Sequence, residues 1–368
     1  MSETARSMPT AGEQLARVRD EDAFDVAAVD TWLRVHARAY VDQHQLSGLP
    51  QVRQFSGGAS NLTYLLTYPE RELILRRPPA GTKAASAHDM AREYRIQQAL
   101  AAAYPYVPRM VALCDEPHVL DSQFYVMERV HGTILRARMP PELGLDAAAT
   151  RRLCVSAIER LVELHRVDPV AAGLAELNRG RGYVRRQVDG WSERFRAART
   201  WNVPSFERNM RWLAEHQPDD VASCVVHNDF RLDNLVLAPD DPQRIVGVLD
   251  WEMATIGDPL MDLGAALAYW VQADDDRVMH ALRRQPTHLP GMLTRAEVVE
   301  QYAHASGRAV EQWTFYEVFG LFRLAVIVQQ IYRRYHQRQT RNPAFRHYWL
   351  AVRYLDRRCR RLVRANRT

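Results

Sequence analysis

The residues best suited to chemistry lie in one short stretch, residues 225–237, which reads VVHNDFRLDNLVL. Apolar pairs at both ends predict two short buried strands, and the polar residues between them predict the loop that joins these strands. Within the loop, His227, Asp229 and Asn234 follow the spacing His-x-Asp-x-x-x-x-Asn. A polar loop held between buried strands is a favourable place for catalytic groups.

A further acidic residue, Asp250, ends a predicted strand (RIVGVLD, 244–250) sixteen residues after Asn234. This arrangement provides one candidate base, Asp229, and two candidate ligands for a hard metal ion, Asn234 and Asp250. Phosphoryl transfer needs positioned carboxylates, Mg²⁺ and a cation on the phosphates, and little covalent chemistry from the protein. In this interpretation Asp229 orients the substrate hydroxyl and accepts its proton.

The first part of the chain has the elements of a small, mostly antiparallel lobe. A Gly-Gly turn, SGGAS (56–60), separates the first two predicted strands, and a helix that should end near residue 103 carries Glu93. The strands are expected near 51–56, 61–68, 72–77, 109–114 and 122–130, after a helix over 24–41.

The later part is expected to be mainly helical, so the fold class is α+β with two lobes. Asp258 and Pro259 predict an N-cap and a first-turn proline for a helix through Trp270. Other helices are predicted over 146–167, 183–199, 204–216, 294–305, 311–337 and 343–365. The expected division is a polar N-terminal tail (1–23), an N-lobe (24–130) and a helical C-lobe (131–368).

Composition limits the classes of protein. The four cysteines lie far apart, which argues against zinc, redox and disulfide motifs and predicts buried thiols. The polar N-terminus and the absence of an eighteen-residue apolar run predict a soluble, cytoplasmic protein. Residues 333–368 contain twelve Arg and one Asp, a local charge of +11, whereas the rest of the chain carries −6. This segment could bind an anionic ligand, a membrane surface or nucleic acid, or could be the solvated face of a terminal helix.

These motifs resemble the aminoglycoside phosphotransferase family, whose fold is similar to that of protein kinases. The resemblance covers roughly residues 50–340. His227, Asp229 and Asn234 match the kinase catalytic loop, and Asp250 in VLDWE matches the aspartate of the D-F-G element. The closest resemblance is to the kinase-like domains fused to some acyl-CoA dehydrogenases.

The resemblance implies a nucleotide site in the first lobe. The SGGAS turn matches the phosphate-covering loop, and Glu93 matches the acidic partner of the phosphate-binding cation. The stretch FYVMERVHG matches the hinge beside the adenine. The implied nucleotide-binding residues are Gly57, Gly58, Ser60, Arg76, Glu93, Met127, Glu128 and Val130.

One position departs from the usual kinase pattern. Arg76 in ELILRR stands where most kinases have lysine, and Lys83, the single lysine of the chain, lies beyond two prolines. Arginine is always charged and can contact two oxygens, so Arg76 is expected to bind the α- and β-phosphates and to pair with Glu93. The fused domains also carry Arg here, which favours an active enzyme.

The resemblance implies roles for two more residues. Arg231 is expected to contact the transferring phosphate, with a surface arginine as the alternative. Asp262 in GDPLMDLG is expected to brace the backbone of the catalytic loop, while Asp233 and Asp258 are expected to serve a loop hydrogen bond and a helix cap.

The predicted function is an ATP- and Mg²⁺-dependent O-phosphotransferase. Only seven residues separate Asp250 from Asp258, which leaves no room for a protein kinase activation segment and indicates a small-molecule acceptor. The arginine-rich C-terminus favours an anionic acceptor such as a hydroxyacyl-CoA, with no nucleic acid or membrane as partner; the sequence gives no oligomeric state. The alternatives are an aminoglycoside or other amino-alcohol kinase, and a nucleotide-binding pseudokinase or interaction module.

Overall fold

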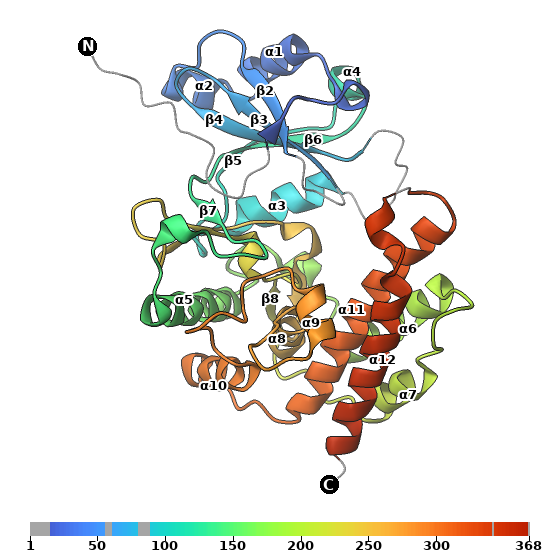
Figure 1. Cartoon of the computed structure of the whole chain (residues 1–368). Helices are drawn as coiled ribbons and strands as arrows, with labels where there is room; N and C mark the ends of the chain where they lie inside the picture. The colour runs from blue at the N-terminus through green and yellow to red at the C-terminus, as the bar shows by residue number, and fades with distance from the viewer. Residues whose placement is uncertain (1–14, 56–60, 80–88, 341, 367–368) are drawn as a thin grey trace. The chain divides into compact units, whose positions relative to one another are not determined.

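The chain forms two compact units in the computed structural model, which describes residues 15–55, 61–79, 89–340 and 342–366. Unit 1 consists of Met1–Leu135 and Asn234–Glu252, and unit 2 of Arg136–Asp233 and Met253–Thr368. The units do not coincide with the predicted lobe ranges, because the segment from Asn234 to Glu252 groups with unit 1. Figure 1 labels most of the elements of both units.

Unit 1 is built on a six-stranded antiparallel sheet with the strand order β1-β2-β3-β4-β6-β5. The five strands predicted here from period-two patterns are confirmed, with slightly shorter ends. The first strand belongs to the expected polar tail, but Leu15 pairs with Phe55. The strands are β1 (Leu15–Ala16), β2 (Gln51–Phe55), β3 (Leu62–Thr67), β4 (Glu72–Arg77), β5 (Met110–Cys114) and β6 (Phe124–Glu128).

The side chains of β4 alternate between the two faces of this sheet, as strand geometry requires. Leu73 and Leu75 join the apolar cluster that includes residues of α1 (Val26–His36) and α2 (Arg38–His44). Ile74 joins a second cluster with Met90 of α3. Arg76 is two residues further along the strand, so it lies on the same face as Ile74 and points toward α3.

Helix α3 (Met90–Leu100) begins where its sequence provides a cap. The carboxylate of Asp89 accepts a hydrogen bond from the backbone N–H of Arg92 at 2.8 Å. The helix predicted over 24–41 is two helices, because Ala37 leaves helical geometry at φ −116° between α1 and α2. A short helix, α4 (Pro117–Leu120), was not predicted.

A second, three-stranded sheet in unit 1 carries the segment from Asn234 to Asp250. It has the order β10-β9-β7 and consists of β7 (Thr133–Ile134), β9 (Leu235–Leu237) and β10 (Ile245–Val248). The chain enters β7 through Gly132, at φ 153°, where an added Cβ would lie 2.0 Å from the carbonyl oxygen of Leu237. Only glycine permits this approach of backbone to backbone.

Unit 2 is mainly helical, as predicted, with one two-stranded sheet. Strand β8 (Cys224–Val226) leads into the polar loop and pairs with β11 (Thr255–Gly257), which the sequence analysis missed along with α9. The helices are α5 (Ala147–Arg166), α6 (Tyr183–Ala198), α7 (Glu207–Glu215), α8 (Pro259–Leu267), α9 (Arg277–Leu282), α10 (Arg295–Ser306), α11 (Trp313–His336) and α12 (Tyr348–Ala365).

Helices α8 and α11 pack with their backbones in contact. An added Cβ at Gly264 would lie 2.6 Å from the carbonyl oxygen of Tyr316, and one at Gly320 would lie 2.1 Å from that of Gly264. The Asp258 cap predicted for α8 is confirmed, since its carboxylate accepts from the N–H groups of Leu260 and Met261. Each helix contributes one side chain, Asp262 of α8 and Arg323 of α11, that contacts the backbone of the polar loop.

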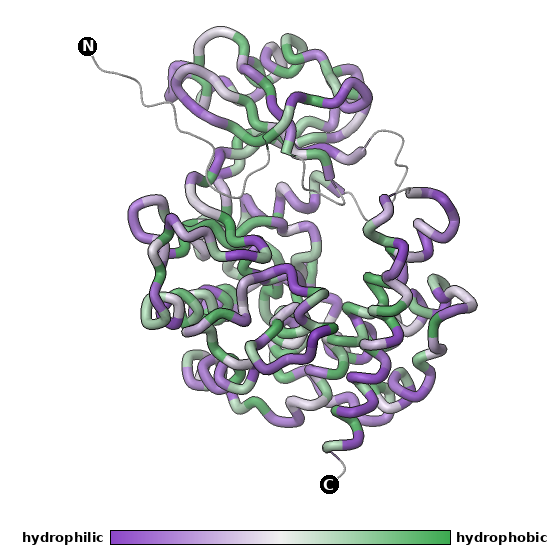
Figure 2. Tube along the Cα trace, viewed as in Figure 1, coloured by the Kyte–Doolittle hydropathy of each residue, from purple (hydrophilic) through white to green (hydrophobic). Residues whose placement is uncertain are grey.

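Helix α11 is the one described helix with the length and apolarity of a membrane span, with a mean hydropathy of 1.2 over eighteen residues. Of that window 61% is buried inside the protein, as in the core helix of a folded domain. By contrast, α12 alternates between hydrophilic and hydrophobic residues along its length (Figure 2). The four cysteines are buried free thiols, as predicted.

Candidate active site

Arg76 connects two carboxylates within unit 1. Its Nη1 lies 2.5 Å from Oε1 of Glu93 on α3, and its Nη2 lies 3.2 Å from Oδ1 of Asp250. The forked shape of the guanidinium is what allows one side chain to contact both. The structure therefore brings together three residues that the sequence analysis had singled out for nucleotide and metal binding.

The three charges affect one another because the site is buried. Burial acts to lower the pKa of the Arg76 guanidinium, but the carboxylates of Glu93 and Asp250 outweigh it and hold that pKa well above its usual value. Burial raises the pKa of Glu93, and Arg76 opposes this shift. Glu93 is 1% exposed, so it is a support for Arg76 rather than a contact for a ligand.

The two candidate metal ligands lie close together in unit 1. The carbonyl of Asn234 accepts from the N–H of Leu249 at 2.8 Å, and Leu249 directly precedes Asp250. Asp250 has a left-handed backbone, φ 68°, and a side chain that is 34% exposed. Such backbone conformations are uncommon outside glycine and cluster at functional sites.

This donor set fits Mg²⁺. The ion is usually held by one or two protein oxygens, with phosphate and water completing its shell. In the described part of the chain no three His, Cys, Asp or Glu residues are grouped for a metal. Asn234 and Asp250 are the residues that would hold it.

The residues after Asp250 replace the Phe and Gly of the D-F-G element and have structural contacts. Trp251 is fully buried and its Nε1 donates to the carbonyl of Val248 at 2.8 Å. Glu252 accepts from Nδ2 of Asn61 at 3.2 Å through its carboxylate and from Arg92 through its carbonyl. These contacts tie the aspartate segment to the sheet and to α3.

The predicted hinge residues lie at the end of β6. Met127 is buried in the apolar cluster on the α3 side of the sheet. The N–H of Glu128 donates to the carbonyl of Arg109 at 2.9 Å, and its carboxylate accepts from the hydroxyl of Tyr40 at 2.8 Å. Val130 follows the strand. The phosphate-loop residues of the prediction, Gly57, Gly58 and Ser60, and also Lys83, lie outside the described residues.

In unit 2, Asp262 braces the start of the catalytic loop, as predicted. Its carboxylate accepts from the N–H groups of His227 at 2.6 Å and Asn228 at 2.7 Å. His165 of α5 contacts the same carboxylate at 3.2 Å and the hydroxyl of Tyr302 at 2.8 Å. Burial opposes ionisation of Asp262, but these hydrogen bonds hold its pKa below the usual value.

A second brace comes from α11 and was not predicted. Nη2 of Arg323 donates to the carbonyl of Asn228 at 2.6 Å, while its guanidinium lies 5.1 Å from the ring centroid of Trp191. The amide of Asn228 also contacts the hydroxyl of Tyr183 at 3.2 Å and the carbonyl of Met253 at 3.2 Å. Hydrogen bonds of both its backbone and its side chain therefore hold Asn228 in a left-handed conformation, φ 63°.

His227 and Asp229 have different places in this loop. His227 is completely buried, and its Nδ1 accepts from the N–H of Asp229 at 3.2 Å. His227 therefore positions the backbone of Asp229 and does not contact a substrate. The carboxylate of Asp229 remains 19% exposed and lies 3.2 Å from Nε of Arg231.

Arg231 is enclosed, so the alternative of a surface arginine is wrong. Its side chain is 17% exposed, its Nη2 lies 3.3 Å from Oδ2 of Asp233, and its guanidinium lies 4.5 Å from the ring centroid of Tyr269. Burial raises the pKa of Asp233, and Arg231 opposes this shift. Arg231 thus joins Asp229 and Asp233 in one charged cluster, and Asp233 continues directly into Asn234.

The residues that prediction missed come from distant parts of the sequence. His165, Tyr302 and Tyr183 carry no motif that marks them as partners of the loop. Arg323 does have a signal, because it interrupts the apolar run VFGLFRLAVIV, and a charged residue in such a run indicates a buried polar contact.

The fold and the two groups of residues define a phosphotransferase of the kinase-like class. The sequence matches the phosphotransferase enzyme family over residues 51–298. The chain belongs to this family. Its predicted fold, a two-lobed α+β protein-kinase-like fold, is confirmed. As a member of this family, the chain is a phosphotransferase.

Relatives and solved structures support this assignment. Over 78% of its length the chain is 35% identical to acyl-CoA dehydrogenase family member 10 of Mus musculus, and the match covers 27% of that protein. Over 89% of its length it is 31% identical to acyl-CoA dehydrogenase family member 11 of Homo sapiens, and the match covers 41% of that protein. It thus spans less than half of these relatives. A structure from Ralstonia eutropha, classed among the aminoglycoside phosphotransferases, matches with a TM-score of 0.74 and 29% identity over 91% of this chain and 96% of that one. Choline kinase from Cryptosporidium parvum shares the fold, with a TM-score of 0.61 and 11% identity over 93% of this chain and 97% of that one.

Proposed function

We propose that the chain is an ATP- and Mg²⁺-dependent kinase that phosphorylates a hydroxyl group of a small anionic acceptor, a hydroxyacyl-CoA thioester. The observation that carries the proposal is the position of Arg76 between Glu93 and Asp250, at 2.5 and 3.2 Å. The arginine at the usual lysine position is therefore held by the helix carboxylate and adjoins the candidate metal ligand. This favours a working nucleotide site over a pseudokinase.

The proposed reaction assigns one task to each residue. Asp229 accepts the acceptor's hydroxyl proton while the oxygen forms a bond to the γ-phosphorus, and the bond from that phosphorus to the oxygen of ADP breaks. Arg231 stabilises the charge of the transferring phosphoryl group. Arg76 binds the remaining phosphates. Bound Mg²⁺, held by Asn234 and Asp250, would neutralise the charge that develops on the phosphate oxygens.

The braces around the loop support this assignment of Asp229. Asp262 and Arg323 fix the backbone on either side of Asn228, one residue before the base. A base must be held within hydrogen-bond reach of the proton it removes. A rigid backbone keeps that geometry, so no conformational entropy has to be lost to orient the base during the reaction.

The proposed acceptor class rests on charge and on the names of the relatives. Arg353, Arg357 and Arg361 lie at every fourth position on the exposed side of α12, whereas amino sugars are polycations that such a surface would repel. Arginine binds phosphate and carboxylate through paired hydrogen bonds. The relatives with 31–35% identity are named as acyl-CoA dehydrogenase family members, which makes a CoA thioester the first acceptor to test.

The test is phosphoryl transfer from labelled ATP in the presence of Mg²⁺, with 3-hydroxybutyryl-CoA, 3-hydroxybutyrate and kanamycin as acceptors. The proposal expects the label to appear on the CoA thioester, and its loss when Mg²⁺ is chelated. A parallel series with labelled GTP identifies the donor base. Preferential phosphorylation of kanamycin would contradict the acceptor class, and nucleotide binding without transfer to any hydroxyl would favour a binding module.

A further inference from the structure

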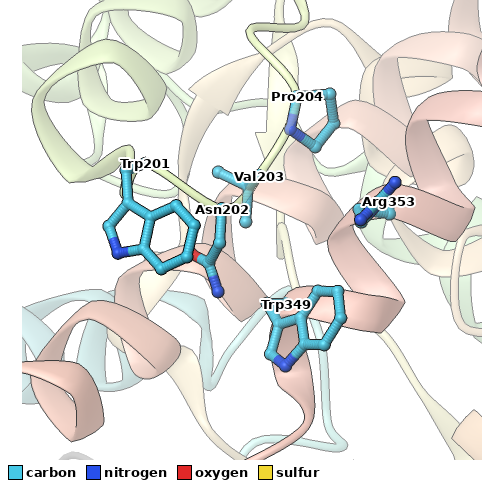
Figure 3. A pocket seen from close by; sticks show the side chains of 6 residues that line it. All are labelled: Trp201, Asn202, Val203, Pro204, Trp349 and Arg353. Carbon is cyan, nitrogen blue, oxygen red and sulfur yellow. The ribbon is translucent and has the colours of Figure 1, made fainter.

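Unit 2 contains a hollow of about 660 Å³ that is separate from the catalytic loop residues described above. The segment between α6 and α7 forms one wall and α12 forms the other (Figure 3). A volume of several hundred Å³ is within the range of small-molecule sites. The hollow is lined by Trp201, Asn202, Val203, Pro204, Trp349 and Arg353.

Two tryptophans give this hollow aromatic walls. Trp201 is 84% exposed, an unusual degree for the largest apolar side chain. Trp349 lies on the opposite wall, and in Figure 3 the two indoles stand on either side of Asn202. Exposed indole faces are suited to stacking against a planar ring, since every base has a π-face.

The hollow favours a negative charge beside that ring. Arg353 lies one helical turn after Trp349, with its guanidinium 5.7 Å from the indole centroid, and the lining contains no carboxylate. Among the described residues no acidic side chain pairs with Arg353. Neighbouring arginines differ, because Arg358 pairs with Asp275 at 2.8 Å and Arg360 pairs with Asp356 at 2.8 Å.

The wall is fixed to the helix that also braces the catalytic loop. Asn202 donates from Nδ2 to the hydroxyl of Tyr332 on α11 at 2.9 Å, and Gln329 donates to the carbonyl of Ala198 at 2.9 Å. Tyr332 follows Arg323 by nine residues, which corresponds to about 13 Å along the helix axis. A ligand that reached from this hollow to the loop would therefore need a long arm.

We propose that this hollow binds the adenine and phosphate groups of the CoA part of the acceptor. The adenine stacks on Trp201 and Trp349, and the phosphates bind Arg353 and Arg357, the next exposed arginine on α12. The pantetheine arm then spans the distance to the loop. A ring, several negative charges and a long arm are the features that CoA combines. The inference rests on the proposed function, and names the part of the acceptor that gives affinity.

Binding of free coenzyme A, measured by calorimetry with ADP and Mg²⁺ saturating the donor site, tests the inference without catalysis. Trp201→Ala and Arg353→Glu are each expected to raise the Kd about tenfold or more, since stacking on an aromatic residue and a charged contact each contribute on that order. Leu350→Ala, an exposed apolar neighbour, and Arg364→Glu, the same charge change in the last turn of α12, are matched controls expected to leave the Kd unchanged. Equal Kd values for all four variants and the parent would overturn the inference.

Kinetics separate this inference from the proposed function. With 3-hydroxybutyryl-CoA, Trp201→Ala is expected to raise KM about tenfold with little change in kcat, and to leave KM unchanged for the same acyl group on N-acetylcysteamine, which lacks the nucleotide. Phosphorylation of both thioesters with no effect of Trp201→Ala would refute the hollow as a CoA site and leave the kinase intact. Phosphorylation of neither would refute the proposed acceptor, while the calorimetry would still decide whether the hollow binds CoA.

Discussion

Replacing Arg323 by methionine tests whether the brace from α11 supports catalysis. The change removes the 2.6 Å hydrogen bond to the carbonyl of Asn228 while keeping a long apolar side chain against Trp191. A hydrogen bond from a charged donor contributes about 1.5–3 kcal/mol, and Asn228 loses a contact that holds it at φ 63°. If this free energy holds Asp229 in place in the transition state, its loss raises the activation barrier by the same amount, and kcat falls about tenfold to 150-fold.

The assay compares kcat, both KM values and thermal melting of Arg323→Met with those of two other variants. Arg323→Lys retains a cation and is expected to recover part of kcat, whereas KM for ATP stays near the parent value in both. Arg194→Met is the matched control, because Arg194 also lies over Trp191, at 4.7 Å, but is an exposed residue of α6. A folded Arg323→Met protein with the kcat of the parent would refute the positioning argument.

Three other predictions concern charged groups. Asp250→Ala should abolish the Mg²⁺ dependence of nucleotide binding, and calorimetry showing the same Mg²⁺ effect as in the parent would contradict this. Arg76→Lys should keep substantial activity and Arg76→Ala should not. Full activity of the alanine variant in steady-state assays would show that another residue is the phosphate-binding cation. Burial raises the pKa of Asp258 from 3.8 to about 6, so the folded state holds this proton more tightly than the unfolded state. The free energy of unfolding should therefore fall by up to about 3 kcal/mol as pH rises from about 4 to about 6. Asp258→Asn should remove this slope in urea titrations, and an unchanged slope would assign the pH dependence to other groups.

The elements with strong periodic patterns could be predicted from the sequence. Alternation of apolar residues located the five longer strands of the main sheet, and the helices of unit 2 followed from helical spacing and caps such as Asp258. Among the strands of two or three residues, β8 and β9 were predicted because apolar pairs flank the polar loop, whereas β7 and β11 have no such flanking signal. Their pairing depends on partners far away in the chain.

The candidate site also has residues that the sequence predicted and residues that it did not. Asp229, Asn234 and Asp250 were found because their residue types and spacing carry the chemistry. The braces were missed because His165 and Arg323 lie 97 and 95 residues from their contacts, and one sequence does not show which distant residues meet. The close approach of Gly264 and Gly320, which sets α8 against α11, is likewise a property of the folded chain.

The substitution Asp229→Asn in the presence of labelled ATP, Mg²⁺ and 3-hydroxybutyryl-CoA tests the central claim most directly. The account predicts that the parent protein transfers the label to the acceptor and that the variant binds the nucleotide with similar affinity. It also predicts that transfer by the variant falls about a hundredfold or more, since a positioned base is lost. An Asp229→Asn protein that transfers phosphate at the parent rate would contradict the account.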